Sequence, residues 1–288
     1  MSVAEAVARQ EFHQAERLPP QVTASLQYIA VTDGKPRSYM YEPPPGVPQI
    51  NASYERHGAL IRSLRPIAHR LSLDIEGFKL LNHRSEVRDF YSDDEVRDRH
   101  YPEVEKLVAE ATGAACVIVF DHTVRSRREN VQLVAGRVRR DPVPRVHNDY
   151  TAKSGPQRVR DLLVEEAEAL LRRRFSIFNV WRPIRGPLED APLALCDARS
   201  VAPEDLVATD LVYKDRIGEI YNVKHSAAHR WFYAPRMSRD EVLLFRSYDS
   251  AEDGRARFVP HAAFEDPTAP RDALPRESIE LRTLVFYG

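Results

Sequence analysis

The chain has 288 residues, enough for one substantial core, and a formal net charge of −1 that argues against a dedicated nucleic-acid binder. Its only cysteines, Cys116 and Cys196, are too few for a disulfide framework. No run approaches the ~18 apolar residues of a membrane span, and residues 1–20 lack the apolar stretch of a signal peptide. We therefore expect a single cytoplasmic domain, 1–288, without nucleic-acid or membrane partners.

The first part of the chain, residues 1–120, reads as an α/β portion. Its predicted elements are a polar helix or loose arm over 1–20, a strand over 22–31 paired with 38–41 across the Asp33-Gly34 turn, a strand over 78–81, a helix over 92–112 and a buried strand over 116–120. Proline-rich residues 43–48 can be neither helix nor central strand and form a connector.

Residues 125–145 are rich in arginine. Seven arginines fall in this stretch against only Glu129 and Asp141. One interpretation is a solvated loop. The other is a lid that meets an anionic substrate or cosubstrate.

A helix is predicted from Ser154 onward. Ser154 and Gln157 have the spacing of a capping box, and the apolar residues from Val159 to Leu171 form one stripe. Arginines at 172–174 would complement the negative end of the helix dipole. We expect this helix to pack against the sheet.

From residue 175 onward the chain alternates between short strands and turns. The predicted strands are 176–181, 193–196, 211–213, 219–223, 231–233, 242–247, 257–259 and 278–286. This stretch has no room for the crossover helices of a parallel sheet. A mainly β fold with flanking helices, of the jelly-roll type, is therefore expected, with a core over 121–288.

The central motif is His147-Asn148-Asp149. On an extended strand, side chains two apart point to the same face. His147 and Asp149 could thus offer an imidazole and a carboxylate to one ion, two thirds of a two-His-one-carboxylate triad.

Candidates for a third ligand and for an anion anchor follow downstream. The histidines are His225, His229 and His261, and His261 comes after a strong strand over 241–245. Arg276 and Ser278 share a face of the final strand, where a guanidinium fork and a hydroxyl could bind a carboxylate.

The order His-x-Asp, His, Arg-x-Ser resembles the Fe(II)/2-oxoglutarate-dependent oxygenases, and more closely the family of the cephamycin 7α-methoxylation protein CmcJ and the fungal hydroxylase/desaturase AsaB. The segments that carry the resemblance are Leu73-Asp74, Gly77-Phe78, 120–125, 147–149, 179–183, 195–197, 229–233 and 275–280.

This resemblance implies a double-stranded β-helix (jelly roll, cupin-like) that binds Fe(II) and 2-oxoglutarate and uses O2. It implies that His147, Asp149 and His261 are both the catalytic residues and the iron ligands. It also implies that Arg276 and Ser278 hold the cosubstrate.

Two reserve assignments and two pocket residues accompany this scheme. Arg276 follows His261 at a longer spacing than the family pattern, so Arg282 is the reserve anchor, and His229 is the reserve ligand. We expect Asn179 and Arg182 to face the same pocket and contribute to cofactor binding. The alternative for Arg182 is a surface ion pair.

The implied activity is hydroxylation or desaturation of a small organic molecule in secondary metabolism. The sequence does not identify the substrate. Trp181 and the aromatic run 231–233 could line its pocket or belong to the core. A homodimer is compatible with the sequence, which leaves the oligomeric state open.

Two other hypotheses stay open. In the first, a cupin-like isomerase or hydrolase uses another divalent ion without 2-oxoglutarate. In the second, a jelly-roll module binds without catalysis, and His147 and Asp149 form only a surface pair.

Overall fold

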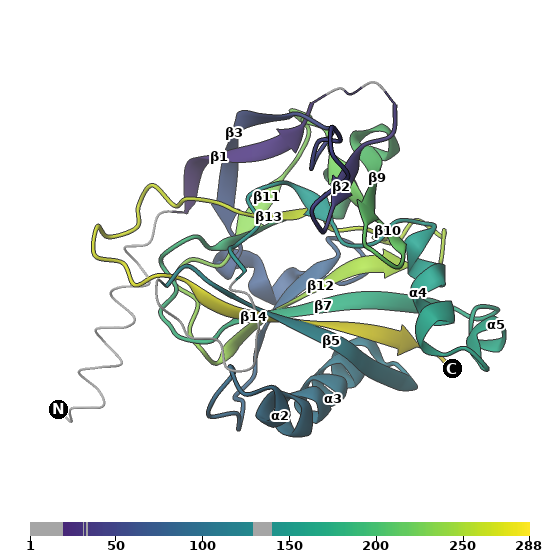
Figure 1. Cartoon of the computed structure of the whole chain (residues 1–288). Coiled ribbons are helices and arrows are strands. Elements are labelled where there is room, and N and C mark those ends of the chain that lie inside the picture. Colours follow the sequence, from purple (N-terminus) through teal and green to yellow (C-terminus); the bar gives the residue numbers. More distant parts are fainter. Residues whose placement is uncertain (1–19, 31, 33, 129–139) are drawn as a thin grey trace.

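The computed structural model describes residues 20–30, 32, 34–128 and 140–288, and two β-sheets dominate it (Figure 1). The strands are β1 (Gln21–Ile29), β2 (Arg37–Tyr39), β3 (Tyr54–Ser63), β4 (Phe78–Asn82), β5 (Cys116–Ser126), β6 (His147–Asn148), β7 (Phe175–Pro183), β8 (Leu193–Cys196), β9 (Leu206–Val212), β10 (Ile217–Val223), β11 (Trp231–Tyr233), β12 (Glu241–Asp249), β13 (His261–Ala263) and β14 (Glu277–Phe286). The helices are α2 (Asp93–Glu95), α3 (Tyr101–Thr112), α4 (Ser154–Leu162) and α5 (Ala167–Leu170), the π-helix η2 (Val96–His100), and the 3₁₀ turns η1 (Arg65–Arg70), η3 (Ala198–Ser200) and η4 (Pro203–Asp205).

The large sheet has the strand order β1-β3-β11-β8-β13-β6-β10-β9-β2, and the small sheet β4-β12-β7-β14-β5. The neighbours β13 and β6 lie in the middle of the large sheet and pair antiparallel. The large sheet curls, so its edge strand β1 meets the chain just before β6, where Val146 donates its backbone N–H to the carbonyl of Gln27.

The small sheet is covered on both faces, which is why every residue of β7 is buried. Phe178 and Val180 point to one side, where they share a hydrophobic cluster with Val104 and Val108 of α3. Trp181 points to the other side and packs with residues of the large sheet such as Leu195. The alternation along β7 therefore separates a helix-facing side from a side that faces the space between the sheets.

Gly77 lets the chain pass close to the segment that leads into β13. Its φ of +90° lies in the left-handed region, and a Cβ there would lie 2.4 Å from Cγ2 of Val259. Val259 in turn accepts a hydrogen bond from His261. The glycine thus helps to place a site residue.

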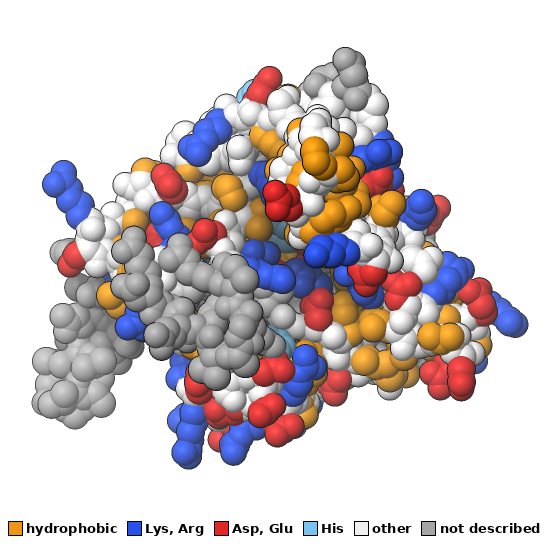
Figure 2. Space-filling model, viewed as in Figure 1, with side chains coloured by type: hydrophobic (Ala, Val, Ile, Leu, Met, Phe, Trp, Pro, Cys, Tyr) orange, Lys and Arg blue, Asp and Glu red, His pale blue; other side chains and the backbone are white. Residues whose placement is uncertain are grey.

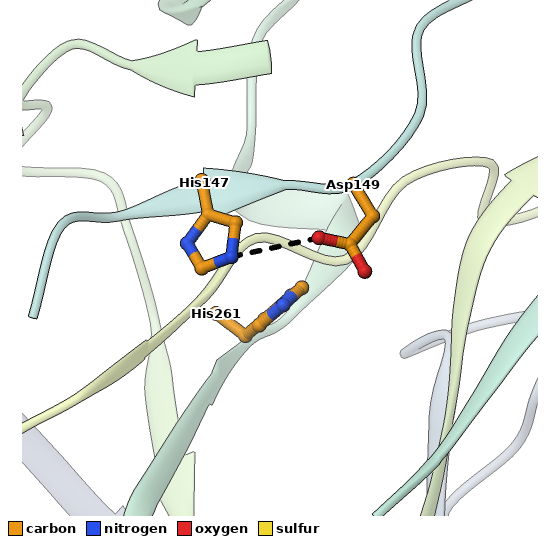
Figure 3. Close-up of side chains that lie close together, drawn as sticks. All are labelled: His147, Asp149 and His261. Atoms are coloured by element: carbon orange, nitrogen blue, oxygen red, sulfur yellow. Dashed lines mark ion pairs between the residues drawn. The ribbon is translucent and has the colours of Figure 1, made fainter. Parts of the chain in front are cut away.

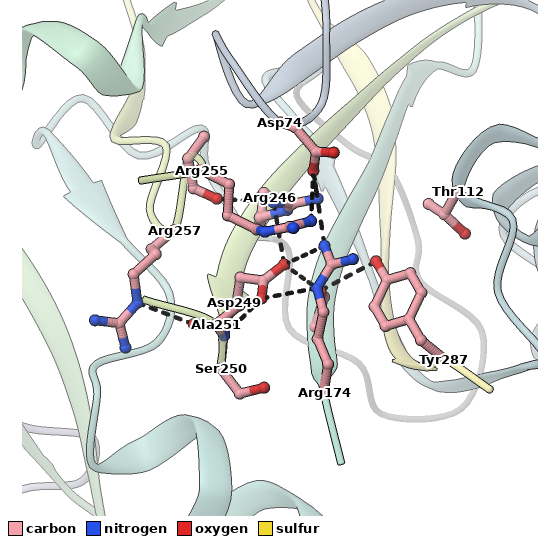
Figure 4. Close-up of polar contacts among 12 residues, drawn as sticks. Asp74, Thr112, Arg174, Arg246, Asp249, Ser250, Ala251, Arg255, Arg257 and Tyr287 are labelled. Atoms are coloured by element: carbon pink, nitrogen blue, oxygen red, sulfur yellow. Dashed lines mark hydrogen bonds and ion pairs between the residues drawn. The ribbon is translucent and has the colours of Figure 1, made fainter. Parts of the chain in front are cut away.

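An ionic network ties the start of β7 to the end of β12 (Figure 4). Asp249 is fully buried and accepts from Arg174 at 2.8 Å and from Arg246 at 3.0 Å. Arg246 also binds Asp74, ahead of β4, at 2.9 Å. Charges buried at this depth require such pairing.

Most of the predicted elements are confirmed, including the mainly β architecture with flanking helices. The helix predicted over 92–112 is present as α2, η2 and α3, and Gly113 ends it at φ +68°. The strands at 78–81, 193–196 and 231–233 are found within one residue of their predicted bounds.

Three predictions of local structure were wrong. Residues 38–41 do not pair with β1, because β2 pairs with β9 and the partner of β1 is β3. The helix from Ser154 breaks into α4 and α5, without the predicted capping box. Residues 257–259 do not form a strand, and the strand in this region, β13, begins at His261.

The arm over 1–20 falls, except for Pro20, outside the described residues, as does much of the arginine-rich stretch. Within the described ranges, no helix is both long and apolar enough to span a membrane. The face seen in Figure 2 carries acidic and basic side chains interspersed. Our division into an N-terminal portion, 1–120, and a core, 121–288, stays a prediction.

Candidate metal centre

Two side chains that are close in the sequence, His147 and Asp149, meet the distant His261 between the two sheets (Figure 3). His147 opens β6, Asp149 follows that strand, and His261 opens β13. One potential ligand atom from each lies within 4.8 Å of the other two. Nε2 of His147 is 3.6 Å from Oδ1 of Asp149, less than twice the ~2.1 Å of a typical metal–nitrogen bond. One ion can therefore contact both.

Backbone carbonyls orient both imidazoles. Nδ1 of His147 donates to the carbonyl of Arg145 at 2.8 Å, and Nδ1 of His261 donates to that of Val259 at 3.0 Å. A carbonyl oxygen can only accept, so each Nδ1 carries the proton and each Nε2 keeps its lone pair. This is how metal-binding histidines are typically fixed.

The two histidines are neutral bases at neutral pH. Burial, aided by the neighbouring His261, lowers the pKa of His147 to about 4. Burial also lowers the pKa of His261. A metal therefore need not displace a proton from either ring.

Asp149 supplies the negative charge. Burial alone would raise its pKa, but Arg282, followed by His261 and His147, holds it well below the ordinary value. Its Oδ2 accepts from Asn179 at 2.8 Å and from Arg282 at 2.7 Å. The carboxylate is thus ionised, and two side chains of the small sheet hold it in place.

Asn148, between the two predicted ligands, links the strands that carry the site. Its amide donates to the carbonyls of Tyr150 and Ser247 at 2.7 and 2.8 Å. Its oxygen accepts from the backbone of Val259 at 3.1 Å. The side chain is fully buried, so these three bonds join β6, β12 and the approach to β13.

Arg276, just before β14, and Ser278, near its start, lie together on the inner side of this strand. Nε of Arg276 donates to Oγ of Ser278 at 3.0 Å, and Nη1 donates to the carbonyl of Ala191 at 2.7 Å. The guanidinium lies over the ring of Trp181, 4.9 Å from its centroid. Burial, aided by Arg125, lowers the pKa of Arg276 to about 9.

The guanidinium of Arg276 is a buried cation without a carboxylate in ion-pair contact among the residues that the structure describes. Its backbone N–H, not its guanidinium, donates to the carboxylate of Asp190 at 2.8 Å. Burial of an unpaired charge is costly, so such a group is suited to an external anion.

Asn179 lies on the side of β7 that faces the triad, where it contacts Asp149, whereas Arg182 does not. A role of Asn179 in cofactor binding stays a prediction. Arg182 lies three residues further along β7 and points to the opposite, helix-facing side. There it contacts His83 at 3.2 Å, the carbonyl of Arg239, and the ring of Phe90. It is not on the surface either, because its exposed fraction is 0%.

The reserve ligand His229 lies elsewhere. Its Nε2 is 3.1 Å from Oδ2 of Asp205, and its ring stacks on Tyr28. It is not part of the group formed by His147, Asp149 and His261. The aromatic residues Trp231 and Tyr233 belong to the same core as Tyr28.

Sequence reasoning missed Glu280 and Arg125. Glu280 lies on the face shared by Arg276, Ser278 and Arg282, and accepts from Arg282 at 2.6 Å. Arg125 is paired with Ser278 across β5 and β14. The period of two along the last strand would have identified Glu280.

The chain matches the family model described as oxidoreductase/YMDC permease-like domain over residues 26–286. It is 32% identical to the hydroxylase/desaturase efuI of Hormonema carpetanum, with 93% of this chain and 96% of the relative covered. It is 33% identical to the Fe(II)/2-oxoglutarate-dependent dioxygenase nvfI of Aspergillus novofumigatus, over 87% and 90% of the two chains.

The fold has a counterpart among solved structures. A structure of the iron and alpha-ketoglutarate-dependent endoperoxidase NvfI superposes with a TM-score of 0.85 at 28% identity. The match covers 93% of this chain and 99% of that one.

Proposed function

The chain belongs to the family of Fe(II)/2-oxoglutarate-dependent hydroxylases and desaturases, and from this membership we propose that it oxidises a small organic molecule at an iron ion held by His147, Asp149 and His261. The resemblance identified from the sequence is confirmed by these relatives, and the jelly-roll fold by the structural match. The ligand assignment is our proposal.

The observation that carries the proposal is the convergence of three donor atoms within 4.8 Å, two from neutral imidazoles and one from a carboxylate. This donor set suits non-haem Fe(II) and leaves other coordination positions open. When bound, Fe(II) supplies the reduction of O2 coupled to decarboxylation of 2-oxoglutarate, which yields succinate, CO2 and the oxidised substrate.

Arg276 and Ser278 are proposed to bind the carboxylate of 2-oxoglutarate that is distant from the iron. The guanidinium can donate to such a dianion, because none of the described carboxylates forms a direct ion pair with it. Trp181 beneath the guanidinium supports its plane and excludes water from that side. Arg125, across from Ser278, adds a second positive charge.

The protein's own contribution is positioning. The carbonyls of Arg145 and Val259 bind Nδ1 of each ring, which leaves both Nε2 atoms available to one ion. Phe245, whose ring centroid is 4.8 Å from that of His261, forms an apolar wall behind this ligand. These contacts fix the geometry before any metal binds.

The substrate is proposed to be a small molecule of secondary metabolism, and its oxidation a hydroxylation or desaturation. The names of the relatives support this range, since they include hydroxylase/desaturase, dioxygenase and endoperoxidase. A cytoplasmic location and a homodimer remain proposals from the sequence. The relatives do not favour a metal isomerase or a non-catalytic module.

The test is metal analysis of protein purified without air, followed by incubation with O2 and 2-oxoglutarate. We expect about one iron per chain and iron-dependent formation of succinate. Metal binding without succinate formation would favour the isomerase or hydrolase. Absence of a bound metal would favour the binding module.

A further inference from the structure

The carboxylate of Asp149 presents its two oxygens to different surroundings. Oδ1 faces Nε2 of His147 at 3.6 Å. Oδ2 accepts two hydrogen bonds, from Nε of Arg282 at 2.7 Å and from Nδ2 of Asn179 at 2.8 Å. A carboxylate oxygen has about two lone-pair directions. Both directions of Oδ2 are therefore occupied by the protein, and only Oδ1 is free.

The two donors are themselves held in place. Ser247 donates to Oδ1 of Asn179 at 2.8 Å, which turns the amide so that its NH2 group faces Asp149. Asn179 and Arg282 are direct partners in the pairing of β7 with β14. They therefore form one cross-strand unit beneath the carboxylate.

Arg282 is fixed at three points. Besides Asp149, it donates to Glu280 at 2.6 Å and to Asp121 at 3.1 Å. Burial would lower the pKa of Arg282, but these carboxylates hold it well above the ordinary value. Because Arg282 is surrounded by acidic partners, it does not act as the reserve anchor for 2-oxoglutarate.

We propose that Arg282 and Asn179 are positioning residues that restrict Asp149 to binding the metal through one oxygen. The proposal rests on the proposed function, since it assumes that the triad holds the metal. If Oδ2 were free, it could occupy a further coordination position. The cosubstrate and O2 need the positions that the triad leaves open, so the two hydrogen bonds preserve space for them.

The experiment compares Arg282→Gln, Arg282→Lys and Asn179→Ala with the wild type, without air and with Co(II) as the probe metal. Calorimetry measures the dissociation constant of Co(II), and then that of 2-oxoglutarate for the Co(II)-loaded protein. A crystal structure of each Co(II) complex shows whether Asp149 binds through one oxygen or two.

We expect one-oxygen binding in the wild type. In Arg282→Gln and Asn179→Ala, Oδ2 should move toward the metal, and 2-oxoglutarate should bind on the order of 10-fold more weakly, as is typical when support of a metal ligand is removed. Arg282→Lys should not restore the wild-type dissociation constant of 2-oxoglutarate, because an ammonium group cannot reproduce the rigid donor geometry of a guanidinium.

Arg174→Gln is the matched control. Arg174 also pairs with an aspartate, Asp249, through Nε and Nη2, but outside the site. This variant should be less stable than the wild type, but its dissociation constant for 2-oxoglutarate should not change. If Arg282→Gln does not fold by circular dichroism, Asn179→Ala, which removes no charge, carries the test.

Two results would overturn the inference. One is binding of Co(II) through both oxygens in the wild type. The other is a 2-oxoglutarate constant in Asn179→Ala equal to that of the wild type. A wild type that binds no Co(II) would instead refute the proposed function, and the inference with it.

Discussion

His147 and His261 lie directly opposite each other on the neighbouring strands β6 and β13, and their ring centroids are 4.4 Å apart. Both rings reach the same side of the large sheet because directly paired residues share a face. The pairing brings together two histidines that are far apart in the sequence. It also places His261, rather than His229, close enough to His147 and Asp149 to share one ion with them.

Replacement of His261 and replacement of His229 should therefore have different effects. His261→Ala removes a ring whose Nε2 is available to a metal, whereas His229→Ala removes one that pairs with Asp205. We expect His261→Ala to lose iron during purification without air and His229→Ala to retain it. Iron content per chain is the measurement. Retention without His261 together with loss without His229 would refute the assignment.

Arg276→Ala should weaken 2-oxoglutarate binding and leave iron binding almost unchanged, because this residue makes no contact with the triad. Removing one partner of a buried charge pair costs roughly 2–5 kcal/mol, which corresponds to about a 30-fold or larger rise in the dissociation constant. Lysine should rescue poorly, because it lacks the bidentate fork. Calorimetric titration of 2-oxoglutarate is the measurement.

Arg182→Gln is the control for that variant. Arg182 is equally buried and also lies over an aromatic ring, but on the helix-facing side of β7. Its replacement should lower the melting temperature without changing the 2-oxoglutarate constant. An unchanged constant in Arg276→Ala would eliminate Arg276 as the anchor.

Asn148→Ala should destabilise the protein more than a typical surface substitution does. It leaves two carbonyls and one N–H group without their partner in a buried position. Each such group costs about 1–3 kcal/mol, so we expect a loss of about 2 kcal/mol or more in the free energy of unfolding. Urea denaturation measures it. A loss under about 0.5 kcal/mol, the range of neutral surface changes, would contradict this role.

Glu103 should contribute to the acid sensitivity of the fold. Burial would raise its pKa, but hydrogen bonds from His100, Ser85 and the backbone of Glu86 lower it from 4.5 to about 2. Because the folded-state value is depressed, this contribution to stability is present above pH 4.5 and is lost as the pH falls toward 2.

The matched variant is Glu103→Gln, which cannot ionise. The difference in unfolding free energy between wild type and variant should shrink as the pH is lowered through that range. Urea denaturation at a series of pH values gives the comparison. A constant difference would show that ionised Glu103 has no stabilising role.

The sequence predicted the features that depend on local periodicity. The period of two placed His147 beside Asp149 and Arg276 beside Ser278, and both pairs share a face in the structure. The same period would have put Arg182 on the opposite face from Asn179, so this error was avoidable. The helix before Gly113 was predictable from the acidic residues of its first turn and from the glycine that ends it in a left-handed conformation.

Features that depend on distant partners were not predictable from one sequence. Arg276 and Arg282 share a strand face and differ only in their neighbours. Arg282 meets Asp149 and Asp121, which are 133 and 161 residues away. Likewise, the Asp33-Gly34 signal suggested a hairpin, but β2 pairs with β9 from the second half of the chain.

The central claim is that one iron ion, held by His147, Asp149 and His261, binds 2-oxoglutarate. The most direct measurement is calorimetric titration of 2-oxoglutarate, without air, into wild type and Asp149→Asn, each with and without Fe(II). We predict one molecule bound per chain in the iron-loaded wild type, with binding greatly weakened when Fe(II) is omitted or Asp149 is replaced. Equal binding by folded Asp149→Asn, or by the wild type without iron, would contradict the claim.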